Sequence, residues 1–233
     1  MNILLTGGSG LIGSELTEKL IENGHQVRIL TREKEIEHPF YHWSKDRIDD
    51  KVFENLDGII HLAGASISKR WTKSYKKEVL DSRVDTANLL FRYVQKHQNK
   101  LKFFISASGT AYYGQITSDK IFVENDSPYS DFLGKVCVEW ENAAFQFQEL
   151  GARVVCLRTS LVLAKNGDGF RLLKKPIQLG IGANLGDGKQ WLPWIHLDDL
   201  VQMYVDTVNK SEMNGSYNAS SPENLSHSEF NHL

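Results

Sequence analysis

The sequence has 233 residues, enough for one large domain or for one domain with a small appendage. With 41% hydrophobic residues, 24% charged residues and a formal net charge of -2, it has no electrostatic bias toward nucleic acid or an anionic membrane. The two cysteines, Cys137 and Cys156, show no metal-ligand spacing, and we find neither a signal peptide nor an apolar run that could span a bilayer. We therefore expect a cytoplasmic protein.

The N-terminus contains the pattern on which the functional prediction depends. Residues 2–6 form a short apolar run, typical of a buried strand, and residues 11–22 form an amphipathic helix. Between them lies a turn with four glycines, Gly7, Gly8, Gly10 and Gly13. A strand, a glycine turn and a helix in this order predict a dinucleotide site, in which the positive end of the helix faces the phosphates.

The rest of the chain alternates between strands and helices. Further strands are expected at 26–31, 40–43, 57–63, 101–108, 152–158 and 215–219. Helices are expected at 72–97, 131–150 and 198–209, with Asp198 as an N-cap, and another begins at Ser226. This alternation predicts an α/β fold, a Rossmann-type doubly wound parallel sheet. We expect a dinucleotide-binding domain at 1–160, and at 161–233 a loop-rich substrate-binding part interleaved with the last strands.

The residues after the second strand bear on the choice of cofactor. An acidic residue at this position binds the ribose hydroxyls of NAD, whereas an arginine accommodates the 2′-phosphate of NADP. The strand ends at Thr31-Arg32, and Glu33 follows. We interpret Arg32 as a phosphate contact, so NADP is expected and NAD is the lesser alternative.

Two other segments are expected to border the ligands. The strand that contains the packed residue His61 ends at Leu62, Ala63 and Gly64, which should pass near the cofactor. Arg70 and Trp71, in a basic and aromatic loop, either border a pocket for an anionic small-molecule substrate or belong to a solvated basic surface. The glycine-rich segment 166–188 should frame the substrate cleft, and a homodimer is a further expectation.

Several separated motifs carry a resemblance to a known family. Together with the glycine turn, the chain contains Ala63-Gly-Ala65, Lys69-Arg-Trp-Thr72, Ser82-Arg-Val84, Ser108-Gly-Thr-Ala-Tyr-Tyr-Gly114, Asp131-Phe-Leu133, Trp140-Glu141 and Trp194-Ile-His196. It resembles the extended short-chain dehydrogenase/reductases, which include sugar-nucleotide epimerases, and within them the bacterial "epimerase family" proteins with their atypical animal relatives. Because these relatives usually continue for several dozen residues, we expect this chain to be truncated or short and to lack part of its substrate lid.

The glycine turn and the resemblance together imply a cofactor site. Its expected members are Gly7, Ser9, Gly10, Leu11, Ile12, Gly13, Thr31, Arg32, Leu62, Ala63, Gly64, Glu78, Arg83 and Val162.

The catalytic residues are less clear from the sequence. Superfamily redox chemistry needs a tyrosine acid, a lysine four residues later that lowers its pKa, and a serine that holds the substrate oxygen. Ser108 and Lys135 match the serine and the lysine, but Asp131 stands where the tyrosine is expected. In one alternative the acid comes from elsewhere, from Tyr112, Tyr113 or Tyr129.

In a second alternative Asp131 is itself the base, although a helix N-terminal role competes with this interpretation. In a third, the protein binds NADP without performing the usual redox step. We therefore predict an atypical oxidoreductase or epimerase of undetermined substrate, and the alternative is a non-catalytic NADP-sensing or binding protein.

Overall fold

The computed structural model describes residues 1–32, 39–116, 118–165, 167, 187–223 and 225–230. Within these ranges, no helix is both long and apolar enough to cross a membrane.

A seven-stranded sheet forms the centre of the molecule, and each of its neighbouring strand pairs is parallel. Its order is β3-β2-β1-β4-β5-β6-β9, so the chain starts in the middle and winds outward in both directions. The strands are β1 (Asn2–Thr6), β2 (Gln26–Thr31), β3 (Phe40–His42), β4 (Gly58–His61), β5 (Phe103–Gly109), β6 (Arg153–Thr159) and β9 (Gly215–Ala219). The predicted doubly wound Rossmann-type sheet is confirmed.

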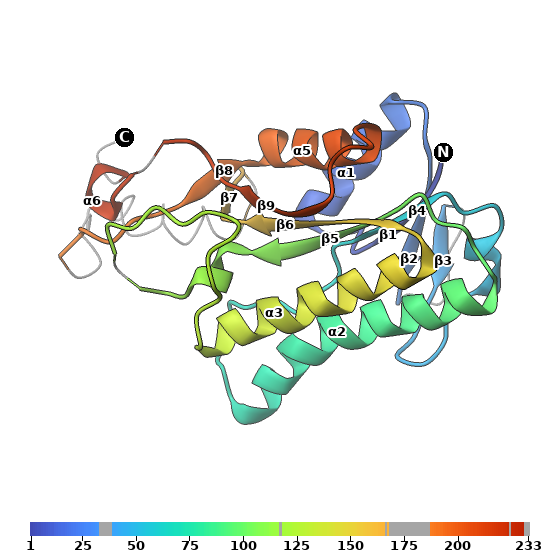
Figure 1. Ribbon diagram of the computed structural model, residues 1–233, viewed down its shortest axis with the longest axis horizontal. Coiled ribbons are helices and arrows are strands. Elements are labelled where there is room, and N and C mark those ends of the chain that lie inside the picture. Colours follow the sequence, from blue (N-terminus) through green and yellow to red (C-terminus); the bar gives the residue numbers. More distant parts are fainter. Residues whose placement is uncertain (33–38, 117, 166, 168–186, 224, 231–233) are drawn as a thin grey trace.

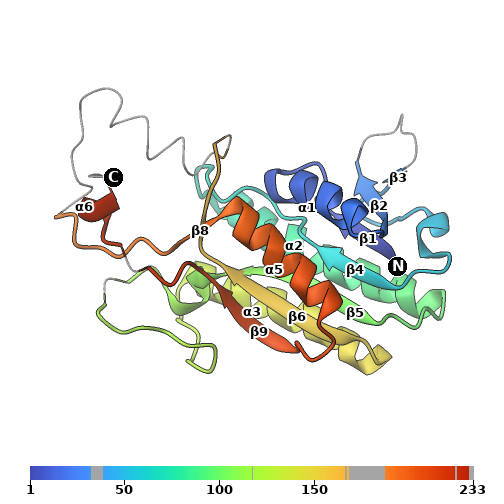
Figure 2. The same ribbon diagram turned by 90° about the horizontal axis from the view of Figure 1, so that it is seen from above.

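Two layers of helices cover the sheet (Figure 1 and Figure 2). One face carries α1 (Leu11–Glu22) and α5 (Leu197–Asn209), and the other carries α2 (Lys73–Lys96) and α3 (Phe132–Phe145). Successive side chains of β1 point to opposite faces of the sheet. Leu5 packs in the core under α1 and α5, and Leu4 packs in the core under α2 and α3. Strands buried on both faces read as continuous apolar runs, which is why they are visible in the sequence.

Several short elements complete the fold. A separate parallel pair joins β7 (Leu161–Leu163) to β8 (Trp194–His196), and neither strand was expected from the sequence. The short helices are η1 (Asp50–Phe53), η2 (Thr110–Tyr113), η3 (Gln146–Leu150) and α6 (His227–Phe230). Figures 1 and 2 place α6 beyond the carboxyl ends of the main strands, the edge where a parallel sheet holds its ligands.

Two helix ends differ from the sequence prediction. The helix expected at 131–150 is α3 up to Phe145, and a 3-10 turn then closes at the left-handed Gly151. The N-cap of α5 is His196 and not Asp198: the ring Nδ1 of His196 accepts the backbone N–H of Asp198 at 3.3 Å. Asp198 lies in the first turn instead, where its charge favours the helix dipole.

Candidate functional site

The turn between β1 and α1 brings backbone against backbone without an intervening side chain. Gly7 has a φ of +74°, and a Cβ on it would lie 3.0 Å from the backbone nitrogen of Ala63. A Cβ on Gly13 would lie 2.2 Å from the carbonyl oxygen of Gly7, which no side-chain movement could relieve. Gly10 is the N-cap of α1 and provides no side-chain cap, so it leaves the first N–H groups of the helix to a ligand. This cradle fits an anionic phosphate group.

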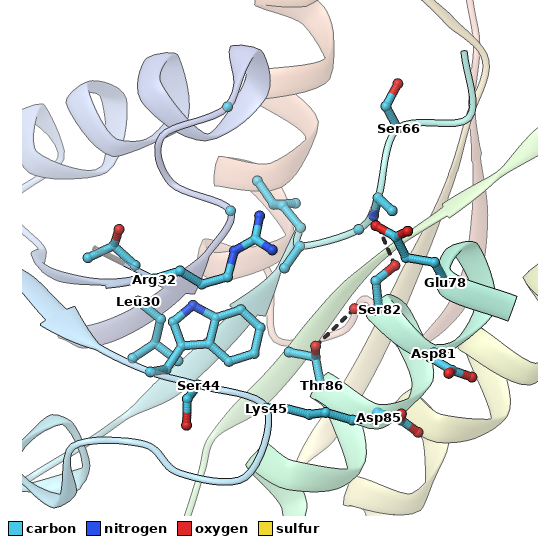
Figure 3. Close-up of a pocket in the computed structure, with 18 of the residues that line it drawn as sticks. Leu30, Arg32, Ser44, Lys45, Ser66, Glu78, Asp81, Ser82, Asp85 and Thr86 are labelled. Carbon is cyan, nitrogen blue, oxygen red and sulfur yellow. Dashed lines mark hydrogen bonds between the residues drawn. The ribbon is translucent and has the colours of Figure 1, made fainter. Parts of the chain in front are cut away.

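A cavity of about 990 Å³ opens beside this turn, at the carboxyl ends of β1, β2 and β4 (Figure 3). Nine of the residues predicted to bind cofactor line it: Gly7, Ser9, Gly10, Thr31, Arg32, Leu62, Ala63, Gly64 and Glu78. Its other lining residues include Leu30, Trp43, Ser44, Lys45, Ala65, Ser66, Lys69, Ser74, Tyr75, Lys77, Asp81, Ser82, Asp85 and Thr86. The cavity is large enough for a cofactor or a drug-sized ligand, by the general size of such sites.

Opposite charges occupy the two sides of the cavity. Arg32 extends from the end of β2, and Glu78, Asp81 and Asp85 project from α2 on the other side (Figure 3). Within the described part of the chain, the Arg32 guanidinium has no ion-pair partner, whereas Asp81 pairs with Lys77. An uncommitted cation next to a phosphate cradle is available to a ligand anion.

Five predicted cofactor residues do not line the cavity. They are Leu11, Ile12, Gly13, Arg83 and Val162. Gly13 packs beneath the turn, Ile12 and Val162 pack against the core under α1 and α5, and Leu11 is 37% exposed at the helix start.

Arg83 lies under the cavity wall. Its guanidinium donates to the carbonyls of Ala65 (3.1 Å) and Val79 (2.8 Å) and stacks on the ring of Trp140, 4.8 Å from its centroid. Burial lowers the pKa of Arg83. The side chain fits there because Gly64 has no Cβ, which would otherwise lie 2.8 Å from the guanidinium carbon.

His61 is fully buried at the end of β4, as the sequence suggested. Its Nδ1 lies 2.8 Å from the Oγ1 of Thr6 and its Nε2 lies 3.1 Å from the carbonyl oxygen of Arg83. Burial is the main cause that lowers the pKa of His61 from 6.5 to about 4; the hydrogen bond to the Arg83 carbonyl opposes this shift, and the charge of Arg83 adds to it. The imidazole is therefore neutral at neutral pH.

This burial predicts a dependence of stability on pH. An unfolded histidine gains a proton near pH 6.5, whereas folded His61 does so only near pH 4. The unfolded chain therefore binds more protons between these values, and the free energy of unfolding should fall by roughly 3 kcal/mol as the pH drops from 6.5 to 4. Urea unfolding of wild type and His61→Gln at pH 7 and 5 tests this: the variant should lose less stability on acidification, and equal losses would contradict the assignment.

Ser108 lies at the end of β5, where a buried ion pair holds its hydroxyl. The Oγ of Ser108 donates to Glu141 Oε1 at 2.7 Å, and Arg158 donates to both oxygens of the same carboxylate at 2.9 Å. Ser216 of β9 donates to Glu141 Oε2 at 2.9 Å. Burial by itself would lower the pKa of Arg158, but the hydrogen bonds and charge of Glu141 outweigh it and raise that pKa. The carboxylate joins α3 to three strands.

The three candidate tyrosines have different surroundings. The hydroxyl of Tyr113 accepts from Arg158 and donates to Asn218 (both 2.8 Å), and burial is the main cause that raises the pKa of Tyr113. Tyr112 carries the Arg158 guanidinium 3.5 Å above its ring, and its hydroxyl has no hydrogen-bond partner among the described residues. Tyr129 is 44% exposed, and its backbone N–H donates to the carbonyl of Tyr112. Of these three, Tyr112 is the one that has both a cation over its ring and a hydroxyl without a hydrogen-bond partner in the part of the chain that the structure describes.

Asp131 and Lys135 lie at the start of α3. Asp131 is the N-cap: its Oδ1 accepts the backbone N–H of Gly134 at 2.7 Å. This is the helix N-terminal role that the sequence left open beside catalysis. Lys135 is exposed on the first turn of the same helix.

Several cavity residues were missed by the sequence reasoning. Ser74, Ser82 and Asp85 follow the helical spacing of the predicted Glu78 along α2, and Ser44 and Lys45 follow an edge strand. Helical spacing, and the position of ligands at the carboxyl ends of parallel strands, could therefore have indicated them. In the basic loop, Lys69 lines the cavity and Arg70 and Trp71 do not; Trp71 packs on Phe132 instead. Glu33 and most of 166–188 lie outside the described residues.

Comparison with known proteins places this site in a family. The sequence profile of the NAD dependent epimerase/dehydratase family matches residues 3–220. An epimerase family protein of Staphylococcus saprophyticus is 37% identical over 224 residues, which cover 94% of this chain and 74% of that protein.

Two solved structures are also similar. One is described as a nucleoside-diphosphate sugar epimerase from Corynebacterium glutamicum (TM-score 0.88, 31% identity, 99% of this chain), and this chain spans 48% of its length. The other is the human epimerase family protein SDR39U1 with NADPH (TM-score 0.84, 28% identity, 99% of this chain and 77% of that one). The glycine turn, the parallel sheet and these matches agree: the chain belongs to the NAD dependent epimerase/dehydratase family.

Proposed function

We propose that this chain binds NADP(H) in the cavity beside the glycine turn and acts as an atypical oxidoreductase or epimerase. The observation that carries the choice of NADP is Arg32, a guanidinium without an ion-pair partner among the described residues, in the same cavity as Gly7, Ser9 and Gly10. A planar guanidinium can donate two hydrogen bonds to a phosphate. The human relative was solved with NADPH, which supports the same choice.

Different residues of the chain bind different parts of the dinucleotide. The start of α1 and the turn at Gly7 and Gly10 hold the pyrophosphate, Arg32 holds the 2′-phosphate, and Leu62 to Gly64 form the wall along the nucleotide. A bound nicotinamide supplies the hydride chemistry. The description of the Corynebacterium protein makes a nucleotide sugar the first substrate class to test, and Lys69 provides a cation at the cavity edge for an anionic substrate.

Among the four candidate catalytic residues, we assign proton transfer to Tyr112. The hydroxyl of Ser108 and the carboxylate of Asp131 are held in hydrogen bonds inside the protein, whereas the Tyr112 hydroxyl has no hydrogen-bond partner among the described residues and a guanidinium lies over its ring. In the usual superfamily site a lysine provides the cation near the tyrosine, and here Arg158 is the cation against the Tyr112 ring. Lys135, exposed at the start of α3, is the remaining cation that could assist.

Replacing Arg32 with alanine tests the choice of cofactor. We expect Arg32→Ala to weaken NADPH binding about ten- to a hundredfold, because it removes charge-assisted hydrogen bonds worth about 1.5–3 kcal/mol, and to leave NADH binding within about twofold. Fluorescence titration with both dinucleotides measures this. Arg92→Ala, an exposed arginine of α2 away from the cavity, is the matched control. Equal affinities for NADPH and NADH that Arg32→Ala leaves unchanged would refute the choice of NADP.

A non-catalytic NADP-binding or NADP-sensing protein is the alternative, favoured by the engagement of Ser108 in the Glu141 ion pair. A crystal structure with NADP separates the two functions. The enzyme requires the Tyr112 hydroxyl within hydrogen-bond reach of a substrate position beside nicotinamide C4. If neither Tyr112 nor another described hydroxyl reaches that position, the binding protein is the better description.

A further inference from the structure

We infer that Thr6 and His61 are positioning residues that fix the Leu62–Ala63 wall of the cofactor cavity. This inference rests on the proposed dinucleotide binding, and it assigns a role to two buried residues that do not themselves need to touch the ligand. Both have 0% exposure, and neither lines the cavity. Their hydrogen bonds explain why polar side chains occupy the end of two central strands.

The first step concerns the end of the pairing between β1 and β4. The strands pair in register up to Thr6 and His61, and the N–H of Leu62 still donates to the carbonyl of Thr6 at 3.2 Å. At Gly7 the chain turns away with a φ of +74°. The next N–H of the continuing β4 chain, that of Ala63, donates instead to the side-chain Oγ1 of Thr6 at 3.1 Å. A side-chain hydroxyl therefore extends the pairing where the backbone of β1 has left it.

The second step is the direction of the hydrogen bonds. Three hydrogen bonds follow one another here. The N–H of Ala63 lies 3.1 Å from the Oγ1 of Thr6, which lies 2.8 Å from the Nδ1 of His61, and the Nε2 of His61 lies 3.1 Å from the carbonyl oxygen of Arg83. The amide at one end can only donate and the carbonyl at the other can only accept. The Nε2 of His61 must therefore donate to the carbonyl of Arg83, and Thr6 must accept from Ala63. Because His61 is fully buried, the imidazole is neutral and carries only this proton, so its Nδ1 accepts the Thr6 hydroxyl.

The third step connects these bonds to the ligand. A Cβ on Gly7 would lie 3.0 Å from the backbone nitrogen of Ala63 and 3.0 Å from the carbonyl carbon of Leu62, so the turn and the wall are in direct backbone contact. Two residues after Ala63, a side-chain hydroxyl again accepts a backbone N–H: the Oγ of Ser82 accepts the N–H of Ala65 at 2.9 Å. Loss of the Thr6 hydroxyl would release Ala63, and the contact that supports Gly7 would be lost with it.

Thr6→Val tests the inference, because valine keeps the shape and removes the hydroxyl. We expect NADPH and NADH to bind about tenfold more weakly, a change of about 1.4 kcal/mol, because the N–H of the half-buried Ala63 loses its acceptor. Thr6→Ser, which retains the hydroxyl, should bind both within about twofold of wild type. The equal effect on both dinucleotides separates this variant from Arg32→Ala, which should act on NADPH alone.

The matched control is Thr207→Val in α5. Thr207 is also fully buried, and its hydroxyl donates to the carbonyl of Tyr204 at 2.7 Å; unlike Ala63, the partner of Thr6, Tyr204 does not line the cavity. Thermal melting should show a loss of stability in both valine variants, and only Thr6→Val should lose affinity. Unchanged affinity in Thr6→Val, or an equal loss in Thr207→Val, would overturn the inference while leaving the proposed function intact.

A pair of His61 variants tests the same chain of bonds if Thr6→Val does not fold. His61→Asn retains an acceptor near the position of Nδ1 and should bind dinucleotide more tightly than His61→Leu, which has none; equal affinities would count against the inference. Wild-type protein that binds neither NADPH nor NADH would refute the proposed function, and the positioning role would be refuted with it.

Discussion

Glu141→Gln is expected to lower the free energy of unfolding by about 3–5 kcal/mol, because it leaves the buried Arg158 guanidinium without its counter-charge. Arg158 is 4% exposed and Glu141 is 5% exposed, so water cannot replace the lost partner. The carboxylate also accepts the hydroxyls of Ser108 and Ser216, and the amide of glutamine can accept through one oxygen only. Urea unfolding followed by tryptophan fluorescence measures the change.

Two further variants show whether the charge is responsible. Ser216→Ala removes one donor and retains the ion pair, so it should cost only about 1 kcal/mol. Replacing both charges, as in Glu141→Leu with Arg158→Met, should recover much of the stability lost in Glu141→Gln, because two apolar side chains leave no buried charge unpaired. If Glu141→Gln unfolds at the same urea concentration as wild type, the ion pair is not a major source of stability.

Gly13→Ala should abolish measurable dinucleotide binding. The new Cβ would lie 2.2 Å from the carbonyl oxygen of Gly7 and 2.6 Å from the Cα of Gly8, so α1 and the turn must move apart. That displacement would misplace the N–H groups that face the phosphates. Losing two charge-assisted hydrogen bonds of about 1.5–3 kcal/mol each corresponds to a loss of affinity of about a hundredfold or more.

Titration with NADPH measures the effect, and circular dichroism checks that the variant is folded. Gly109→Ala provides the control: its φ of -144° suits alanine, and the new Cβ would meet its neighbours at 3.7 Å or more. A folded Gly13→Ala protein that binds NADPH as wild type does would show that the turn does not hold the phosphates.

The fold was predictable because its signals are local. The glycine turn, the apolar strands and the amphipathic α1 can each be recognised from a short stretch of sequence. The bounds of β1, α1, β2 and β9 agree with the prediction. The strands β7 and β8 were missed because three residues carry too little pattern, and their pairing joins distant parts of the chain. Local sequence patterns therefore predicted the main sheet and its helices, whereas β7 and β8 depend on tertiary pairing that no local pattern contains.

The catalytic region was not predictable for a related reason. The position of Ser108 in the sequence suggests a substrate contact, but the group that accepts its hydrogen bond is Glu141, on a helix 33 residues later. Arg83 was expected at the cofactor, and it lies under the wall because Gly64 leaves room for its guanidinium. Asp131 caps its own helix, and this role could be foreseen from its place before α3. Partners from distant elements decide which polar side chains remain available to a ligand.

The position of β9 has a consequence for the order of folding. β9 pairs with β6 at the edge of the sheet, and its Ser216 and Asn218 complete the hydrogen bonds around Glu141 and Tyr113. Because β9 comes late in the chain and closes a long loop, it should be among the last strands to pair. Until it does, the Glu141–Arg158 pair lies at an open edge in contact with water. The unfavourable free energy of removing these two charges from water therefore arises late in folding, when most of the apolar core has already formed.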